Sequence, residues 1–380
     1  MYNKKLVFAA ACLGMLLFGI VLTSLGSILP VITERFHMDQ LTAGSLVSIL
    51  PFGVLAGSLI FGPIVDKYGY KFVLITCIIL VLFGLQGLNA NEFYLLQLGI
   101  FLIGFGGGVI NGGTNALVAD ISDEKGANLS LLGVFFGIGA LGLPSLLSIF
   151  PGLQSTIINA VGIFMSLPLI FILAVRFPAP KNPQGFPLME SGKLLKSPVL
   201  YLLSFVLFFE SGMEGMVSNW TTTFISKTLV EKSELALVVL SSHIAGLTVA
   251  RLILGWVLKK VSPVKVLYAS IGIIILSAVI IILSNNINLS IIGFALLGAG
   301  FAAGFPITLG FVGENFPKLS GTAFSIALVI ALVGNMLINY IMGAVSYYTH
   351  ISNMPLVLGI CAILMLVLIS FYSKKYITKS

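Results

Sequence analysis

Residues 41–89 read LTAGSLVSILPFGVLAGSLIFGPIVDKYGYKFVLITCIILVLFGLQGLN, two long apolar runs that meet at one short charged stretch. Each run has about the 20 residues that an α-helix needs to cross the hydrocarbon core of a bilayer. The charged stretch, from Asp66 to Lys71, leaves room only for a tight connection. This part of the chain therefore predicts two consecutive transmembrane helices, over residues 41–65 and 70–89.

The same alternation of apolar runs and short connections continues over all 380 residues. Hydrophobic residues make up 58% of the chain and charged residues only 9%, whereas a soluble domain carries about 25% charged residues. We expect an all-α membrane protein with about 12 transmembrane helices and no separate soluble domain. The expected spans are 6–30, 41–65, 70–89, 93–119, 128–151, 154–176, 199–224, 235–258, 263–283, 287–313, 320–346 and 352–373.

The first apolar run, from Leu6 to Leu29, follows Lys4 and Lys5 and so has the outline of a signal peptide. It is too long for the apolar region of one, and no small-residue cleavage site follows it. We expect it to be retained as the first helix. The three cysteines all lie inside apolar runs, with neither disulfide nor metal-ligand spacing: Cys12, Cys77 and Cys361.

Basic residues are distributed unequally between the two sides of the predicted bundle. Twelve spans place both termini on one side, and that side carries Lys4, Lys5, Lys67, Lys71, Lys125, Arg176, Lys181, Lys193, Lys196, Lys259, Lys260, Lys265, Lys318, Lys374, Lys375 and Lys379. The opposite side carries Arg35, Lys227 and Lys232, while Arg251 falls within a span. Because cytoplasmic loops are enriched in Lys and Arg, we expect both termini in the cytoplasm and the protein in the bacterial inner membrane.

The two halves of the chain resemble each other. Gly99, Gly104, Gly106 and Asp120 match Gly293, Gly298, Gly300 and Glu314 at a constant offset of 194, and Gly139 matches Gly334 at an offset of 195. We therefore expect a six-helix half over residues 1–176, a cytoplasmic linker over 177–198 and a second half over 199–380. In such duplicated membrane proteins the substrate site lies near the bilayer midplane, where the halves meet.

These residues also resemble a known family. Residues 62–71, Gly-Pro-Ile-Val-Asp-Lys-Tyr-Gly-Tyr-Lys, are similar to the signature loop of the major facilitator superfamily, and a degenerate copy spans Gly246 to Lys260. Within that superfamily, residues 210–220 together with 111–115 look most like the fucose:proton symporter group. The resemblance covers the whole chain and implies two pseudo-symmetric halves, alternating access, and a path lined by all helices except the third, sixth, ninth and twelfth.

Glu210 and Glu214 are the strongest candidates for ion coupling. Both lie on the predicted seventh helix near mid-membrane, where a charge costs about 2.5–3.5 kcal/mol on insertion scales. Their spacing places both carboxyls on one helix face, and the proximity of like charges predicts that one keeps a proton at neutral pH. His243 lies at a similar depth and could share that proton. The alternatives are neutral glutamic acids and a histidine that only hydrogen-bond between helices.

The resemblance and this chain differ in one respect. Fucose-type symporters carry acidic coupling residues on helices 1 and 4, whereas this chain has no acid on the first span and has Asn111 and Asn115 on the fourth. The identity of the coupling ion is therefore left open between a proton, sodium and none, with a proton favoured by the two glutamates.

Asparagines on three predicted helices, together with Glu214 and Trp220, are candidates for substrate binding. Amide groups both donate and accept hydrogen bonds, which suits a polyhydroxylated solute. Small and polar residues also mark packed helix interfaces in lipid, so a purely structural role is the alternative. The candidates are Asn111, Asn115, Glu214, Asn219, Trp220, Asn335 and Asn339.

A second group of charged residues lies towards the predicted cytoplasmic ends. Asp120 and Glu314 occupy matching positions beside the two signature loops, which suggests ion pairs that hold an inner gate. Charged side chains at helix ends can also simply reach the membrane surface. The gating candidates are Asp66, Lys71, Asp120, Arg251 and Glu314.

The chain contains no HExxH, Walker A or GxSxG motif. We expect no enzyme activity, cofactor, metal site or nucleic-acid partner, and we expect a monomer. The favoured function is secondary active transport of a small polar solute, a sugar above all, with proton coupling. The alternatives are export of drugs, lipids or peptides within the same fold, and an integral-membrane enzyme.

The predicted orientation is testable by cysteine labelling in intact cells. In a cysteine-free background, Lys181→Cys in the central loop is expected to resist a membrane-impermeant maleimide, because the loop is cytoplasmic. Lys227→Cys, on the opposite side, is expected to be labelled. Modification of the loop cysteine from outside would overturn the orientation.

Overall fold

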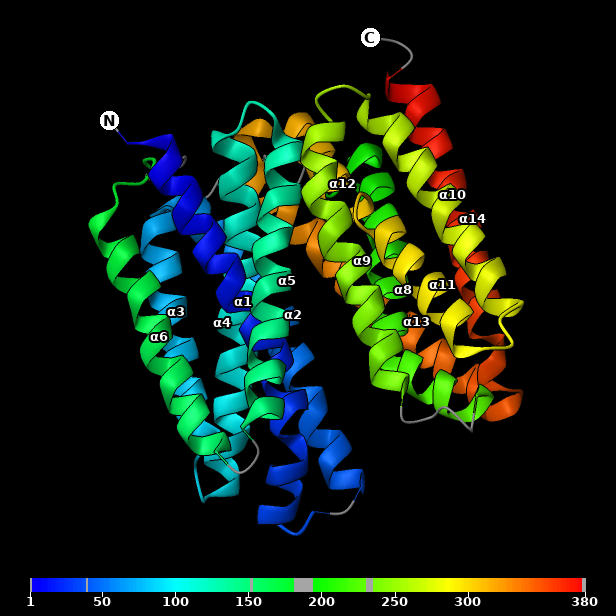
Figure 1. Ribbon diagram of the computed structural model, residues 1–380. Helices are drawn as coiled ribbons and strands as arrows, with labels where there is room; N and C mark the ends of the chain where they lie inside the picture. Colours follow the sequence, from blue (N-terminus) through cyan, green and yellow to red (C-terminus); the bar gives the residue numbers. More distant parts are fainter. Residues whose placement is uncertain (1, 39, 151–152, 181–193, 230–234, 378–380) are drawn as a thin grey trace. The chain divides into compact units, whose positions relative to one another are not determined.

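The computed structural model describes residues 2–38, 40–150, 153–180, 194–229 and 235–377 (Figure 1). Within these ranges twelve helical segments are long and apolar enough to cross a membrane, and no strand is present. The all-α fold class and the number of spans predicted from the sequence are therefore confirmed. Lys181, Lys193, Lys232 and Lys379 lie outside the described residues.

The helices follow one another with short connections. The first half of the chain forms α1 (Lys4–Arg35), α2 (Gln40–Tyr68), α3 (Tyr70–Gly87), α4 (Phe93–Ile121), α5 (Lys125–Ile149) and α6 (Gln154–Ala174). The second half forms α8 (Pro198–Thr228), α9 (Ala236–Val257), α10 (Pro263–Ile282), α11 (Ile287–Phe301), α12 (Gly304–Asn315), α13 (Ser320–Tyr348) and α14 (Met354–Tyr372).

The chain divides into two compact units. Unit 1 comprises Met1–Asp123, Phe135–Ser191 and Phe316–Ser325, and unit 2 comprises Glu124–Val134, Gly192–Asn315 and Ile326–Ser380. The units thus differ from the predicted halves in two short segments, the beginnings of α5 and α13, each of which groups with the other half. We call the end of each unit that carries a chain terminus its terminal end.

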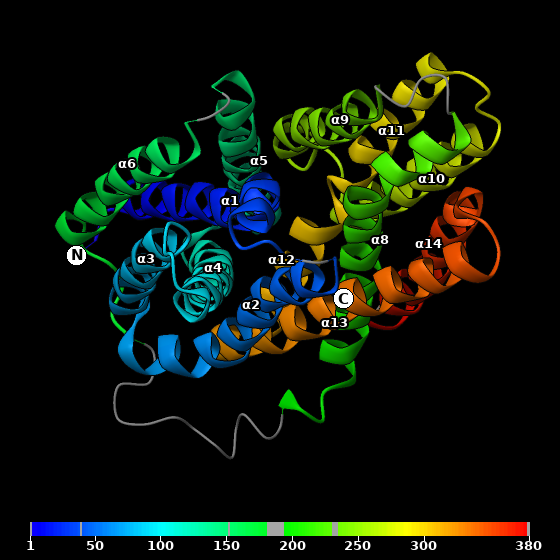
Figure 2. The ribbon, with the colours of Figure 1, turned by 90° about the horizontal axis from the view of Figure 1, so that it is seen from below.

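Equivalent helices pack in the same way within each unit (Figures 1 and 2). In unit 1, α4 lies against α2, α3 and α1, and α3 lies against α6. In unit 2, α11 lies against α9 and α10, α12 lies against α8, and α10 lies against α14. This correspondence is the structural form of the repeat in the sequence.

The matched glycines occupy matched contacts. A Cβ atom on Gly104 would overlap the backbone of Leu50 on α2, and one on Gly298 would overlap the backbone of His243 on α9. Gly99 and Gly106 likewise lie against α3, while Gly293 and Gly300 lie against α10. Glycine is needed at Gly104, Gly298, Gly99 and Gly106 because the helix backbones approach too closely for a side chain, whereas at Gly293 the side chains of Ile280 and Ile281 fill the space.

The tenth predicted span is interrupted. The run predicted as one helix over residues 287–313 is divided into α11 and α12, with a turn at Ala302 and Ala303. Pro306 has no N–H to donate to the carbonyl of Ala302, and its ring crowds that carbonyl. Because α2 contains two prolines and remains continuous, a proline alone does not account for the break.

Gly298→Ala and Gly104→Ala are expected to destabilise the protein by about 1–3 kcal/mol each, because a methyl group would force two helix backbones apart. Gly272→Ala is the matched control, since a Cβ there meets nothing within 4 Å. Thermal unfolding in detergent measures the difference. Equal stability of all three variants would show that the close approach is not required.

Candidate functional site

Glu210 is a fully buried acid in unit 2. It lies in the middle of α8, a 31-residue helix whose start is capped by the hydroxyl of Ser197, which accepts from the N–H of Leu200 at 3.4 Å. The side chain of Glu210 is 0% exposed, and neither carboxyl oxygen has a hydrogen-bond partner among the described residues. The carboxyl lies directly against Gly304, the first residue of α12, where even a Cβ atom would overlap it.

Three other ionisable groups of unit 2 lie on α8 and on the packed helix α9. Glu214 follows one turn later on α8 and is half-buried. His243 on α9 is buried, with its ring edge-on to Phe301 at a centroid distance of 5.8 Å. The charge of Arg251, also on α9, acts on both glutamates and on His243. The three predicted coupling residues thus belong to one electrostatic cluster.

Arg251, on α9, contacts the first turns of α5, which belong to the same unit. Its guanidinium Nη1 donates to the carbonyl of Gly133 at 3.3 Å, and the hydroxyl of Ser130 donates to the Arg251 carbonyl at 2.8 Å. Its Nε atom is buried without a hydrogen-bond partner in the described part of the chain. Predicted as a gating residue, Arg251 therefore also contributes a positive charge that acts on Glu210 and Glu214.

Predicted binding amides on α8 and α13 form a hydrogen-bonded group in unit 2, which we call the amide cluster. The Oδ1 atom of Asn339 accepts from Asn219 Nδ2 at 3.0 Å and from Trp220 Nε1 at 3.2 Å. Asn339 in turn donates to the Oδ1 of Asn335 at 3.2 Å, and Asn335 donates to the carbonyl of Ser211 at 2.9 Å. Four of the predicted binding residues are thus linked by hydrogen bonds: Asn219, Trp220, Asn335 and Asn339.

The remaining predicted binding amides lie on α4 in unit 1. Asn115 is buried, and its Nδ2 donates to both the carbonyl and the Oδ1 of Asn111, at 2.9 and 3.0 Å. Thr114, between them, donates back to the carbonyl of Ile110 at 2.8 Å. Asn111 and Asn115 therefore form one polar strip along a helix that is otherwise rich in glycine and apolar residues.

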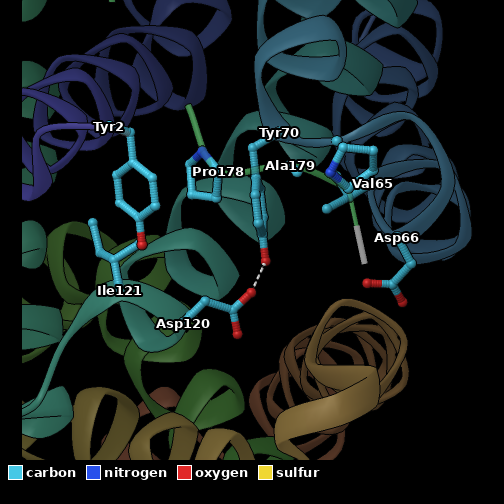
Figure 3. A pocket seen from close by; sticks show the side chains of 10 residues that line it. Tyr2, Val65, Asp66, Tyr70, Asp120, Ile121, Pro178 and Ala179 are labelled. Atoms are coloured by element: carbon cyan, nitrogen blue, oxygen red, sulfur yellow. Dashed lines mark hydrogen bonds between the residues drawn. The ribbon is translucent and has the colours of Figure 1, made fainter. Parts of the chain in front are cut away.

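A cavity of about 160 Å³ lies at the terminal end of unit 1 (Figure 3). Asp66 and Asp120 both line it, and the hydroxyl of Tyr70 points to Asp120 and donates to it. The other lining residues include Tyr2, Val65 and Ile121, together with Pro178, Ala179 and Pro180.

The beginning of α13 donates hydrogen bonds to both of these acids. Thr322 donates to Asp66 Oδ2 at 3.0 Å, and Ser320 donates to Asp120 Oδ1 at 2.7 Å. One turn further, Ser325 donates to the carbonyls of Ser58 and Leu59 on α2. These contacts, together with the Tyr70–Asp120 bond, form what we call the terminal contact of unit 1.

The other predicted gating residues have different surroundings. Lys71 donates to the carbonyls of Leu173 and Val175, at 2.7 and 3.0 Å, and so satisfies the end of α6. Glu314 is exposed at the end of α12. The matched positions of Asp120 and Glu314 in the sequence therefore do not have matching environments.

Sequence reasoning did not identify the hydroxyl donors of the terminal contact, nor Gly304 and Lys125 in unit 2. Tyr70 belongs to the signature loop over residues 62–71, so its position in the sequence could have identified it as a candidate. Lys125 donates to the carbonyl of Gly313 at 3.0 Å, a pairing between residues 188 positions apart that no local pattern indicates.

A repeated bundle of apolar helices with buried polar clusters is the architecture of a polytopic membrane transporter. The described residues contain no group of three metal-ligating side chains. The sequence profile of the Major Facilitator Superfamily matches residues 11–283 and 225–378. The chain therefore belongs to the Major Facilitator Superfamily, and it is a multi-pass membrane transporter, not an enzyme.

Individual relatives are distant. The glucose/mannose transporter GlcP of Bacillus subtilis (strain 168) is 24% identical over 340 residues, which cover 86% of this chain and 84% of the relative. Among solved structures, the transporter FucP in the outward conformation superposes with a TM-score of 0.82 at 18% identity, covering 96% of this chain and 98% of that one. The proton:xylose symporter XylE has a TM-score of 0.80 at 14% identity, covering 98% and 95%. The two structural likenesses establish the fold.

Proposed function

We propose that the protein is a secondary active transporter that moves a sugar or a similar neutral polar solute across the cell inner membrane together with protons. The observation that carries the proposal is Glu210, an acid that is completely buried in a membrane-spanning helix and has no hydrogen-bond partner in the described part of the chain. Such intramembrane acids mark ion pathways and proton relays.

The surroundings of Glu210 favour a proton as its ligand. An ionised carboxylate without partners in apolar surroundings is costly, whereas the protonated form carries no net charge. Arg251 provides a positive charge in the same unit, so a proton leaving Glu210 leaves a carboxylate with a nearby cation. Glu214 and His243 are the groups through which the proton reaches or leaves this site.

The amide cluster supports a hydroxylated substrate. Its donors and acceptors carry no charge, and Trp220 offers an aromatic face of the kind that stacks on sugar rings. Asn111 and Asn115 offer a similar strip in unit 1. Three of the similar proteins named above bear on the solute, since GlcP is a glucose/mannose transporter, XylE is a proton:xylose symporter, and FucP is described as a fucose:proton symporter.

We further propose that the terminal ends of both units are cytoplasmic and that the terminal contact of unit 1 belongs to the inner gate. The excess of Lys and Arg at the terminal ends supports this orientation. Hydrogen bonds from Thr322 and Ser320 to buried or half-buried carboxyls resist separation of α13 from α2 and α4. Opening the path towards the cytoplasm breaks these bonds.

Proton coupling is tested with purified protein in proteoliposomes. A panel of glucose, mannose, xylose and fucose, with and without an imposed pH gradient, identifies the solute that is accumulated. Glu210→Gln is expected to abolish accumulation while exchange of the solute survives, because glutamine resembles the protonated acid. Glu214→Gln is expected mainly to weaken binding, since a carboxylate accepts strong hydrogen bonds from hydroxyl groups.

Glu92→Gln, at an exposed position before α4, is the matched control for both substitutions and is expected to behave as the parent. Full accumulation by Glu210→Gln, by Glu214→Gln and by the double variant would end the coupling proposal. Loss of expression in both single variants, with unchanged pH dependence, would mean that the two acids are structural.

The gate proposal is tested with a cysteine at Ser325, which is buried in the terminal contact. Asp66→Asn is expected to raise the labelling rate of Ser325→Cys from the cytoplasmic side and to lower transport, because it weakens the acceptor of the Thr322 hydroxyl. Asp123→Asn, at an exposed aspartate of the same end, is the control. Equal labelling rates in the two variants would exclude a gating role for Asp66.

A further inference from the structure

The helix α12 joins the buried acid to the terminal end of unit 2. Its first residue, Gly304, lies against the carboxyl of Glu210, and near its last turn the carbonyl of Gly313 accepts from Lys125 at 3.0 Å. Asn315 completes this end, donating to the carbonyl of Phe311 at 2.8 Å and to the hydroxyl of Tyr372 at 3.2 Å. Twelve residues at about 1.5 Å per residue give a rod of about 18 Å.

We propose that α12 responds to the protonation of Glu210, and that Gly304 and Lys125 are the positioning residues at its two ends. The start of a helix carries a partial positive charge, which attracts a carboxylate. The break at Ala302 and Ala303 directs this positive end at Glu210 instead of burying it within a continuous helix. A proton on Glu210 removes the attraction, and α12 is then free to tilt at the break. This inference rests on the proposed coupling role of Glu210.

The absence of a side chain at residue 304 is what allows this contact. The three atoms nearest to a Cβ there all belong to the far end of the Glu210 side chain, so an alanine first displaces the carboxyl. Pro306, two residues later, prevents a hydrogen bond that would otherwise close the break. Both residues are therefore suited to place the end of α12 at the acid.

Few other charges compete for Glu210. Glu214 lies on the same helix, and His243 and Arg251 lie on the packed helix α9. The sequence of α12 contains one charged residue, Glu314 at its opposite end, and the sequences of α11, α13 and α14 contain no Asp, Glu, His, Lys or Arg. On α9 and on α11 to α14, the start of α12 and Arg251 are therefore the positive groups that stand beside this carboxyl.

Lys125 lies at the other end of α12, where it donates to the carbonyl of Gly313. A basic side chain near the end of a helix satisfies a terminal carbonyl and complements the negative end of the helix dipole. Because Lys125 begins α5, a movement of α12 at the break changes a contact of α5 at the terminal end of the same unit. A change in charge at mid-membrane is in this way converted into a change in position about 18 Å away.

The movement is measured by spin labels at Lys265→Cys and Glu314→Cys, two exposed positions at the terminal end of unit 2, in a cysteine-free full-length protein. Between acid and alkaline pH the distance distribution of the parent is expected to change. Glu210→Gln is expected to keep the acid distribution at every pH. A distribution that is independent of pH in a parent that transports uphill would overturn the inference.

Gly304→Ala is expected to shift the pH midpoint of the distance change, and of solute exchange, to higher pH by about 0.2–1.5 units, because the ionised carboxyl loses the helix end that stabilises it. Gly272→Ala, where a Cβ meets nothing within 4 Å, is expected to keep the parent midpoint. Identical midpoints in these two variants would contradict the role of Gly304.

Two further variants keep the inference testable if Gly304→Ala folds poorly. Pro306→Ala restores an N–H and is expected to close the break and suppress the pH-dependent distance change. Lys125→Gln is expected to broaden the distribution at both pH values and to leave the midpoint unchanged. Parent-like distributions in both would overturn the inference.

The same variants separate this inference from the proposed function. If Glu210→Gln accumulates solute as the parent does, proton coupling at this residue fails and the inference fails with it. If Glu210→Gln is uncoupled while the distances in the parent do not depend on pH, only the role of α12 fails.

Discussion

The hydrocarbon core of a membrane offers no water to the peptide backbone, and this absence governs the whole structure. It explains why the described chain is a set of long helices with short connections. It also explains where a helix is allowed to stop. Ala302 and Ala303, the residues between α11 and α12, are 2% and 3% exposed, so the interruption lies inside unit 2 and its freed backbone groups do not face lipid.

The features that the sequence predicts are those set by local composition and by repetition. Apolar runs of spanning length locate the helices, because length and hydropathy alone decide insertion. The matched glycines predict the repeat, and the structure gives the reason: Gly104 and Gly298 each mark the closest approach of two backbones in their own unit. The sequence also identified Glu210 and Glu214 as candidate functional residues, since a carboxyl within an apolar run is costly in a membrane and is rarely there for structure alone.

What the sequence did not predict depends on partners that are distant in the chain. The break in the tenth span lies beside Pro306, and the first residue after it, Gly304, contacts Glu210, which lies 94 residues earlier in the chain. The beginning of α5 belongs to unit 2 because of contacts such as that of Arg251 with Gly133. The beginning of α13 belongs to unit 1 because of contacts such as that of Thr322 with Asp66. Symmetry in the sequence suggested equal roles for Asp120 and Glu314, yet within the described part of the chain only Asp120 accepts hydrogen bonds from hydroxyl groups, those of Tyr70 and Ser320.

In the proposed role of substrate site, the amide cluster has a consequence for how tightly a solute is held. Its amides already bond to one another, as Asn339 does with Asn219, Trp220 and Asn335. A hydroxylated solute that enters must replace these bonds one for one, so the net gain in free energy per hydroxyl is small. Modest affinity shortens the residence time of the solute, and a carrier whose turnover ends in release benefits from a site that binds weakly but in a defined orientation.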